Sequence, residues 1–151
     1  MALNWCFNEA WPTAAGNALV HWPARPNAGY LAAQAACRPV LASARISKFQ
    51  WSGGETFSAE IWLLNDSPAE VPPGEVEVTL AVGGAPKKLL KWAHPPVAAG
   101  RNLKGPGVES VLPKADCGSF ELLLTAGPGG SWSSAYRLSL RREPLPSPEG
   151  A

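Results

Sequence analysis

The chain has 151 residues, enough for one ordinary domain or for a domain of about 100 residues with an appendage. It is too short for a complete barrel enzyme, which typically needs about 250 residues. With 13 basic and 12 acidic residues, the net charge is +1, which gives no long-range field to attract nucleic acid or an anionic membrane surface. We therefore expect neither nucleic acid nor a membrane as a partner.

The sequence has no run of about 20 apolar residues, and its N-terminus lacks the basic segment and apolar run of a signal peptide. We expect a mature protein or an excised piece. Cys6, Cys37 and Cys117 are too few and too scattered for a disulfide framework, and together with His21 and His94 they show no metal-ligand spacing. We expect buried thiols, no metal and no cofactor. Because one cysteine pair can still be bridged, the cellular compartment stays open.

Residues 1–38 are predicted to contain a single helix. The stretch "NAGYLAAQAAC" is rich in alanine and has no β-branched residue, which favours a helix. Asn27 stands at the N-cap position, and Pro39 ends the helix at Arg38. The expected segments are a short strand over about residues 2–7, a loop over 8–26 and the helix over 27–37.

After Pro39 the apolar residues recur at every second position, which is the period of a β-strand. Phe57, Ile61 and Leu63 point one way, whereas Trp62 points the other way and is expected to be exposed or to pack against a neighbour. Short strands with turn residues between them are typical of an antiparallel immunoglobulin-like β-sandwich. The seven runs are "VLASARISKF", "TFSAEIWLLN", "EVEVTLAV", "KKLLKW", "GVESVL", "SFELLLTA" and "SAYRLSLR".

The sandwich is predicted to cover residues 39–142. The tail over residues 143–151, "EPLPSPEGA", is rich in proline and has no apolar face, so we expect it to be disordered. Lys87, Lys88 and Lys91 are expected to guard an exposed sheet edge, and His94 to be a solvated loop residue.

Residues 1–38 cannot enclose a core of their own, because one strand and one helix bury too little apolar area. Leu3, Trp5, Phe7 and Trp11 would remain in water, at a cost of about 25 cal/mol per Å². The segment is therefore expected to pack against the sandwich, against a second copy of the chain, or against protein that this sequence does not contain.

The same segment resembles the end of the catalytic (β/α)8 barrel in family 2 glycoside hydrolases of the β-mannosidase and exo-glucosaminidase type. The stretch "LNWCFNEAWPT" is similar to the eighth barrel strand of that family, and the following residues are similar to the loop, the last helix and the entry into an immunoglobulin-like sandwich. His21-Trp22-Pro23-Ala24 and Cys6-Phe7 depart from the pattern at the barrel mouth. The matching residues are Trp5, Asn8, Trp11, Pro12, Arg25, Pro26, Tyr30, Arg38, Pro39, Val40 and Leu41.

The resemblance implies a parent enzyme that hydrolyses a terminal β-mannoside or a related β-glycoside with retention. Such enzymes use two carboxylates about 5 Å apart, and in this family both lie upstream of the eighth strand. Glu9 is then a structural or rim carboxylate, this chain has no catalytic residue of its own, and alone it should be inactive. The resemblance makes Trp5 the floor of the sugar subsite, with Asn8 and Trp11 as weaker contributors at the barrel mouth.

Two other functions stay open. A stand-alone carbohydrate-binding module would bind polysaccharide and respond to sugar through its tryptophans, whereas a structural or adhesive immunoglobulin-like domain would bind a protein partner. If the chain is instead part of a glycoside hydrolase, its partners are the missing barrel and, through that barrel, carbohydrate. The sugar, the linkage and the compartment are not determined by the sequence.

Overall fold

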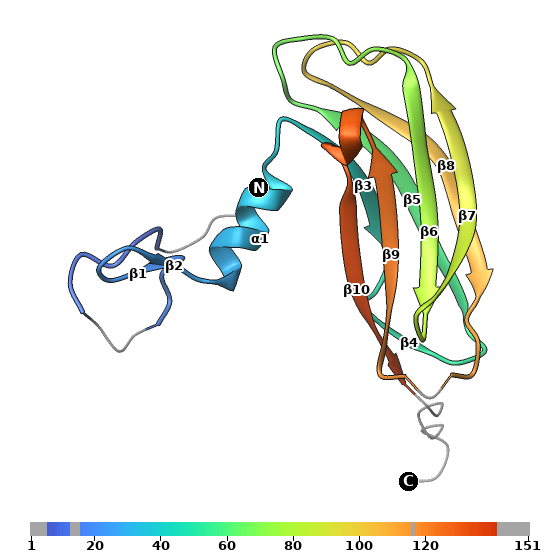
Figure 1. Cartoon of the computed structure of the whole chain (residues 1–151), viewed down its shortest axis with the longest axis horizontal. Coiled ribbons are helices and arrows are strands. Elements are labelled where there is room, and N and C mark those ends of the chain that lie inside the picture. The colour runs from blue at the N-terminus through green and yellow to red at the C-terminus, as the bar shows by residue number, and fades with distance from the viewer. Residues whose placement is uncertain (1–5, 13–15, 116, 142–151) are drawn as a thin grey trace, which may run out of the picture. The chain divides into compact units, whose positions relative to one another are not determined.

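The computed structural model describes residues 6–12, 16–115 and 117–141. The chain divides into two compact units between Arg38 and Pro39, and each is described by itself (Figure 1). Most of the strand predicted at residues 2–7 and the tail predicted to be disordered at residues 143–151 lie outside the described residues.

The N-terminal unit contains a small hairpin followed by a helix. Strands β1 (Val20–His21) and β2 (Arg25–Pro26) pair in an antiparallel manner, in a stretch that we predicted to be a loop. Strands of two residues are too short to show a period in the sequence, which explains the difference. Residues 6 and 7 are not in a strand, and Asn8 makes a single parallel bridge to Val20.

Helix α1 (Ala28–Ala36) confirms the predicted helix and its N-cap. The side-chain oxygen of Asn27 accepts a hydrogen bond from the backbone N–H of Tyr30 at 3.0 Å. At the other end, the backbone N–H of Cys37 donates to the carbonyl of Ala33, and Pro39 follows two residues later. No residue of α1 is buried, so this helix does not gain its stability from an apolar core within the described unit.

The C-terminal unit is a sandwich of two sheets, which confirms the predicted mostly-β fold (Figure 1). One sheet has the order β4-β10-β9-β6-β7 and the other β3-β5-β8, and all pairs are antiparallel except β4 with β10. Strand β7 lies beside β6, whereas in constant-type immunoglobulin domains the corresponding fourth strand lies beside the strand equivalent to β8. The bounds are β3 Val40–Ile46, β4 Gln50–Ser52, β5 Thr56–Asn65, β6 Gly74–Val82, β7 Ala85–His94, β8 Arg101–Val111, β9 Ser119–Ala126, the 3-10 turn η1 Pro128–Gly130 and β10 Ser134–Arg141.

All seven runs that we predicted to be strands are strands. Strand β8 begins several residues before its predicted run, and the three-residue β4 was not predicted. The inward residues alternate along each strand, as predicted for Phe57, Ile61 and Leu63, and they form one main core between the sheets. Phe57 packs edge-on against both Trp51 and Phe120, with ring centroids 5.1 and 5.5 Å apart.

The outward side of β5 carries Trp62, in agreement with the predicted alternation. Its indole is half-buried, and the Nζ of Lys104 lies 5.7 Å from the ring centroid. Lys104 also pairs with Glu60 at 2.9 Å, so that charged side chains surround Trp62 on this face.

His94 was predicted to be solvated, and this prediction is wrong. The residue ends strand β7 and is 4% exposed. Its Nδ1 lies 2.9 Å from the carbonyl oxygen of Pro95, and its Nε2 is buried without a hydrogen-bond partner in the described structure. The ring fills the space beside Gly74, where an added Cβ would lie 2.9 Å from Nε2. The buried position follows from the pairing of Gly74 with His94 across β6 and β7.

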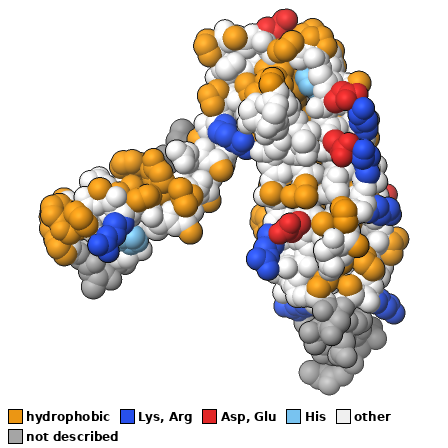
Figure 2. Space-filling model, viewed as in Figure 1, with side chains coloured by type: hydrophobic (Ala, Val, Ile, Leu, Met, Phe, Trp, Pro, Cys, Tyr) orange, Lys and Arg blue, Asp and Glu red, His pale blue; other side chains and the backbone are white. Residues whose placement is uncertain are grey.

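The cysteines also differ from the expectation of buried thiols. Cys37 is exposed, Cys6 and Cys117 are half-buried, and none of the three forms a disulfide within the described part of the chain. The lysines of β7 do lie on the edge strand of the larger sheet, where Lys88 pairs with Glu77 and Lys91 with Glu75. Figure 2 shows acidic and basic side chains next to one another along this flank.

Candidate functional site

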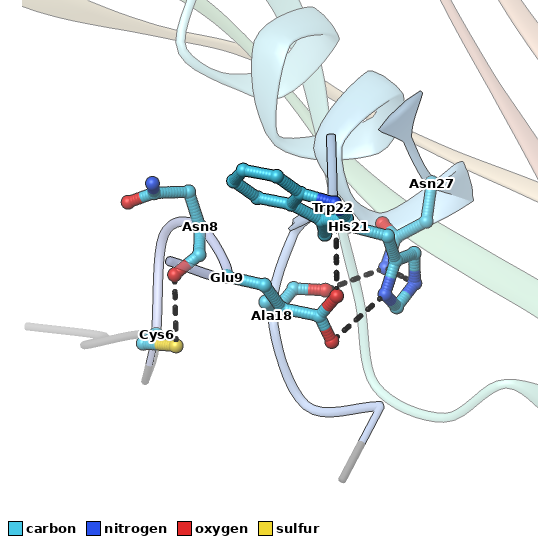
Figure 3. Close-up of polar contacts among 7 residues, drawn as sticks. All are labelled: Cys6, Asn8, Glu9, Ala18, His21, Trp22 and Asn27. Atoms are coloured by element: carbon cyan, nitrogen blue, oxygen red, sulfur yellow. Dashed lines mark hydrogen bonds and ion pairs between the residues drawn. The ribbon is translucent and has the colours of Figure 1, made fainter. Parts of the chain in front are cut away.

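Glu9 is held inside the N-terminal unit by three hydrogen bonds, and Figure 3 shows the two that its side chain makes. Its backbone N–H donates to the carbonyl of Val20 at 3.0 Å, which places the residue beside strand β1. Its Oε2 accepts a hydrogen bond from the backbone N–H of Trp22 at 2.9 Å, and its Oε1 lies 3.3 Å from Nδ1 of His21. The Glu9 side chain is 5% exposed, and its carboxylate ties residues 6–9 to the turn of the hairpin.

His21 links the carboxylate to the start of helix α1. Because a carboxylate has no proton to donate, Nδ1 of His21 is the donor to Glu9, and Nε2 is left to accept. The side-chain amide of Asn27 lies 3.4 Å from Nε2 and also donates to the carbonyl of Ala18 at 2.8 Å. A continuous polar chain, Glu9–His21–Asn27, therefore joins the N-terminal segment, the hairpin and the helix (Figure 3).

The environment of Glu9 does not suit an acid catalyst. The hydrogen bond from the Trp22 backbone, with a smaller contribution from His21, lowers the pKa of Glu9 below its ordinary value of 4.5. A general acid in a glycosidase needs a raised pKa so that it still carries its proton near neutral pH. Both oxygens of Glu9 are also occupied within the protein. These contacts favour a structural role for Glu9.

Of the three residues that we predicted to contact sugar, the structure describes Asn8 and Trp11. Trp5 lies outside the described residues. Asn8 is exposed, and the Sγ of Cys6 lies 3.5 Å from its backbone carbonyl oxygen rather than from its side-chain amide. Trp11 is 69% exposed. Their role at a barrel mouth stays a prediction.

The described residues of the N-terminal unit form almost no core. Among its described residues only Ala18 is buried, whereas four large side chains remain largely in solvent. In Figure 2, apolar side chains gather on the visible face of this unit. The exposed fractions are 62% for Phe7, 69% for Trp11, 48% for Trp22 and 56% for Leu31. Isolated apolar residues are ordinary on a protein surface. It is unusual, however, for a segment to expose several large apolar side chains and to bury none of that size.

The described residues contain no group of three or more His, Cys, Asp or Glu side chains that could hold a metal ion. Within the same part of the chain, no helix is long and apolar enough to cross a bilayer.

Two open grooves lie on the sandwich, and sequence reasoning did not find either of them. One lies on the β3-β5-β8 sheet beside Arg45, Ser58, Glu60 and Glu109. The other lies on the larger sheet and combines charged residues with a tryptophan and several prolines. Its lining includes Pro72, Pro73, Glu75, Glu77, Lys91, Thr125, Pro128 and Trp132. These residues come from three strands and two loops, so only the register of the sheet brings them together.

No protein-family model and no curated protein matches this sequence. Among solved structures, the DNA glycosylase AlkC of Pseudomonas fluorescens is similar at 17% identity over 74% of this chain and 33% of that chain, with a TM-score of 0.47. The sporulation control protein Spo0M of Bacillus subtilis is similar at 9% identity over 68% and 49%, with a TM-score of 0.46. A β-glucosidase of Listeria innocua is similar at 11% identity over 67% and 16%, with a TM-score of 0.45.

This chain thus spans between about a sixth and a half of the length of these three proteins. The three differ in what they do, and a shared sandwich says nothing by itself about activity.

Proposed function

We propose that this chain is the C-terminal accessory region of a retaining glycoside hydrolase. Residues 1–38 would supply the last strand, loop and helix of the catalytic barrel, and the sandwich would brace that barrel. The parent enzyme would hydrolyse a terminal β-mannoside or a related β-glycoside. Both catalytic carboxylates would lie in the rest of the parent, so this chain alone would not turn over substrate.

The observation that carries the proposal is the mismatch between the two units. The sandwich has a complete core made of its own strands, whereas the described N-terminal residues bury only Ala18 and expose Phe7, Trp11 and Leu31. A segment with barrel-type motifs and an unburied apolar surface is what the last part of a barrel would look like without its other strands. The polar chain from Glu9 to Asn27 would then fix the hairpin against the helix at the barrel rim.

The first experiment is to translate the coding sequence immediately upstream of Met1 in frame. The proposal expects a barrel of about 250 residues that carries one Glu after its fourth strand and another after its seventh. A stop codon directly upstream would overturn it.

The second experiment tests the role of Trp5 in the full enzyme. Trp5→Ala should lower kcat/KM on an aryl β-mannoside by about ten-fold or more, because the sugar loses its aromatic floor. Phe49→Ala, at an exposed position just before strand β4 of the sandwich, is the control and should leave kcat/KM unchanged. Equal losses in both variants would contradict a substrate-binding role for Trp5.

A further inference from the structure

The groove on the larger sheet is built by three neighbouring strands. In the register of the sheet, Glu77 of β6 lies opposite Lys91 of β7 on one side and opposite Thr125 of β9 on the other. Side chains at paired positions point to the same face, so these three form a row across the outer face of the sheet. The groove has a volume of about 580 Å³, within the range of about 300–1,000 Å³ usual for small-molecule sites.

The charged side chains at the groove form ion pairs, so neither sign of charge is in excess. Oε2 of Glu75 lies 3.0 Å from Nζ of Lys91, and Oε2 of Glu77 lies 2.6 Å from Nζ of Lys88. Each carboxylate is only partly buried and uses one oxygen for its lysine, so the other oxygen can accept a hydrogen bond from a ligand. Lys91 and Thr125 add donors. The result is a set of alternating donors and acceptors with little net charge.

The apolar part of the groove is rigid. Trp132 is half-buried and packs directly on Gly127, where an added Cβ would lie 2.4 Å from the indole ring. The backbone of Trp132 is fixed on both sides, since its N–H donates to Ala126 at 3.1 Å and its carbonyl accepts from Ala42 at 2.8 Å. Pro72, Pro73 and Pro128 complete this wall, and prolines lose little freedom when a ligand binds.

We propose that this groove is a saccharide-binding site for an uncharged oligosaccharide. A sugar chain offers hydroxyl groups, which both donate and accept, together with C–H faces that suit an indole and proline rings. An anionic ligand would meet carboxylates whose lysines are already paired with them, and a purely apolar ligand would strip water from these ion pairs. Only the use of β-linked oligosaccharides as probes rests on the proposed function. The groove itself lies within the sandwich and does not depend on the barrel.

The test is a titration of the isotope-labelled 151-residue chain, followed by two-dimensional NMR. The probes are β-1,4-mannohexaose, cellohexaose and laminarihexaose, with an oligogalacturonate of the same length as the charged control. We expect saturable shifts of the Thr125 and Glu77 amides and of the Trp132 indole N–H with at least one neutral probe. The oligogalacturonate should bind at least about ten-fold more weakly.

Two variants locate the site. Glu75→Ala combined with Glu77→Ala should weaken binding of the neutral probe by about ten-fold or more, because both acceptors are lost. Glu121→Ala changes the same residue type on the outer face of β9, outside the groove, and should alter affinity by less than about two-fold. The NMR spectra of the variants show directly whether the sandwich is still folded.

The inference is overturned if no neutral probe shifts the groove signals at probe concentrations up to about 10 mM. The dissociation constants of even weak specific complexes lie below that concentration. It is equally overturned if the shifts gather around Trp62 or if the oligogalacturonate binds more tightly. Neither outcome affects the barrel proposal, which depends on the upstream coding sequence. Conversely, a stop codon upstream of Met1 leaves this titration unchanged.

Discussion

At the scale of single residues, the ionisation of Glu9 affects the stability of the N-terminal unit. Glu9 stabilises the N-terminal unit only while it is ionised, because its oxygens accept from Trp22 and His21. Its pKa is lower in the folded state than the ordinary 4.5, so the folded state binds fewer protons. The contribution of Glu9 is therefore present above about pH 4.5 and is lost as the pH falls through the lowered pKa.

We predict that the backbone amide of Trp22 becomes less protected against hydrogen exchange as the pH is lowered from about 6 to about 3, after correction for intrinsic exchange rates. Glu9→Gln should already show the reduced protection at neutral pH and should lose the pH dependence. Glu70→Gln, at an exposed loop position in the sandwich, is the control and should behave as the unchanged chain. Pronounced pH dependence in Glu9→Gln would contradict the assignment.

Asn65 is the most extensively bonded buried side chain of the sandwich. Its amide nitrogen lies 2.9 Å from the carbonyl of Ala69, 3.0 Å from that of Val97 and 3.1 Å from that of Ala98. Its Oδ1 accepts from both the N–H and the hydroxyl of Ser67. One side chain at the end of β5 thus joins the loop between β5 and β6 to the loop between β7 and β8.

We predict that Asn65→Asp lowers the free energy of unfolding by about 3 kcal/mol, because a carboxylate would face carbonyl oxygens where an amide now donates. Asn102→Asp makes the same chemical change at an exposed position on the neighbouring strand and should cost less than about 0.5 kcal/mol. Urea unfolding followed by tryptophan fluorescence measures both. Similar losses in the two variants would show that Asn65 is not the tie between the loops.

At the scale of single elements, strand β8 shows how a glycine can be required by its neighbour. A Cβ on Gly105 would lie 2.5 Å from the ring of Trp92, whereas a Cβ on Gly107 would come no closer than 3.7 Å to the carbonyl oxygen of Ala59. Neither glycine has a positive φ, so the two differ in space and not in backbone strain. They form a matched pair within one strand.

Gly105→Ala should therefore lower the free energy of unfolding by about 2 kcal/mol through overpacking against Trp92. Gly107→Ala should be neutral within about 0.5 kcal/mol or slightly stabilising, because alanine has less freedom to lose on folding. Thermal unfolding monitored by circular dichroism compares the two. A loss in Gly107→Ala as large as in Gly105→Ala would rule out the clash as the cause.

Helix α1 depends on Asn27 in two separable ways. The side-chain oxygen caps the helix, and the side-chain nitrogen holds the hairpin through Ala18 and His21. Asn27→Asp should keep the cap but lose the bonds to the hairpin, whereas Asn27→Ala should lose both and cost the helix about 1 kcal/mol. Hydrogen exchange at the Tyr30 amide reports the cap, and it should be protected in Asn27→Asp but not in Asn27→Ala. Loss of protection in both variants would contradict the separation.

The elements that could be predicted from the sequence are those in which local pattern and tertiary packing agree. The alternation in β5 gave the correct inward face, and the alanine-rich stretch after Asn27 gave the helix. The hairpin β1–β2 and strand β4 were missed because two or three residues carry no period. The burial of His94 and the groove on the larger sheet both depend on the register between strands, as the pair Gly74 and His94 shows. The sequence of one strand does not reveal its register with the next, so neither feature was predicted.

At the scale of the whole molecule, the two units differ in how they hold themselves together. Every buried residue of the two sandwich clusters lies after Pro39, so removal of residues 1–38 takes nothing from that core. The apolar surface of Phe7, Trp11, Trp22 and Leu31, in contrast, belongs to the segment that would be removed.

We predict that a chain of residues 39–142 keeps the thermal midpoint of the sandwich within about 3 °C of that of the 151-residue chain, because its core is unchanged. Binding of an apolar dye such as ANS should fall sharply in the shorter chain, since the exposed aromatic residues are gone. If the full chain instead binds little dye and is a monomer by light scattering, its N-terminal segment already covers its own apolar surface, and the need for a missing barrel disappears. A full chain that dimerises while the shorter one stays monomeric would show that residues 1–38 pair with a second copy when the barrel is absent.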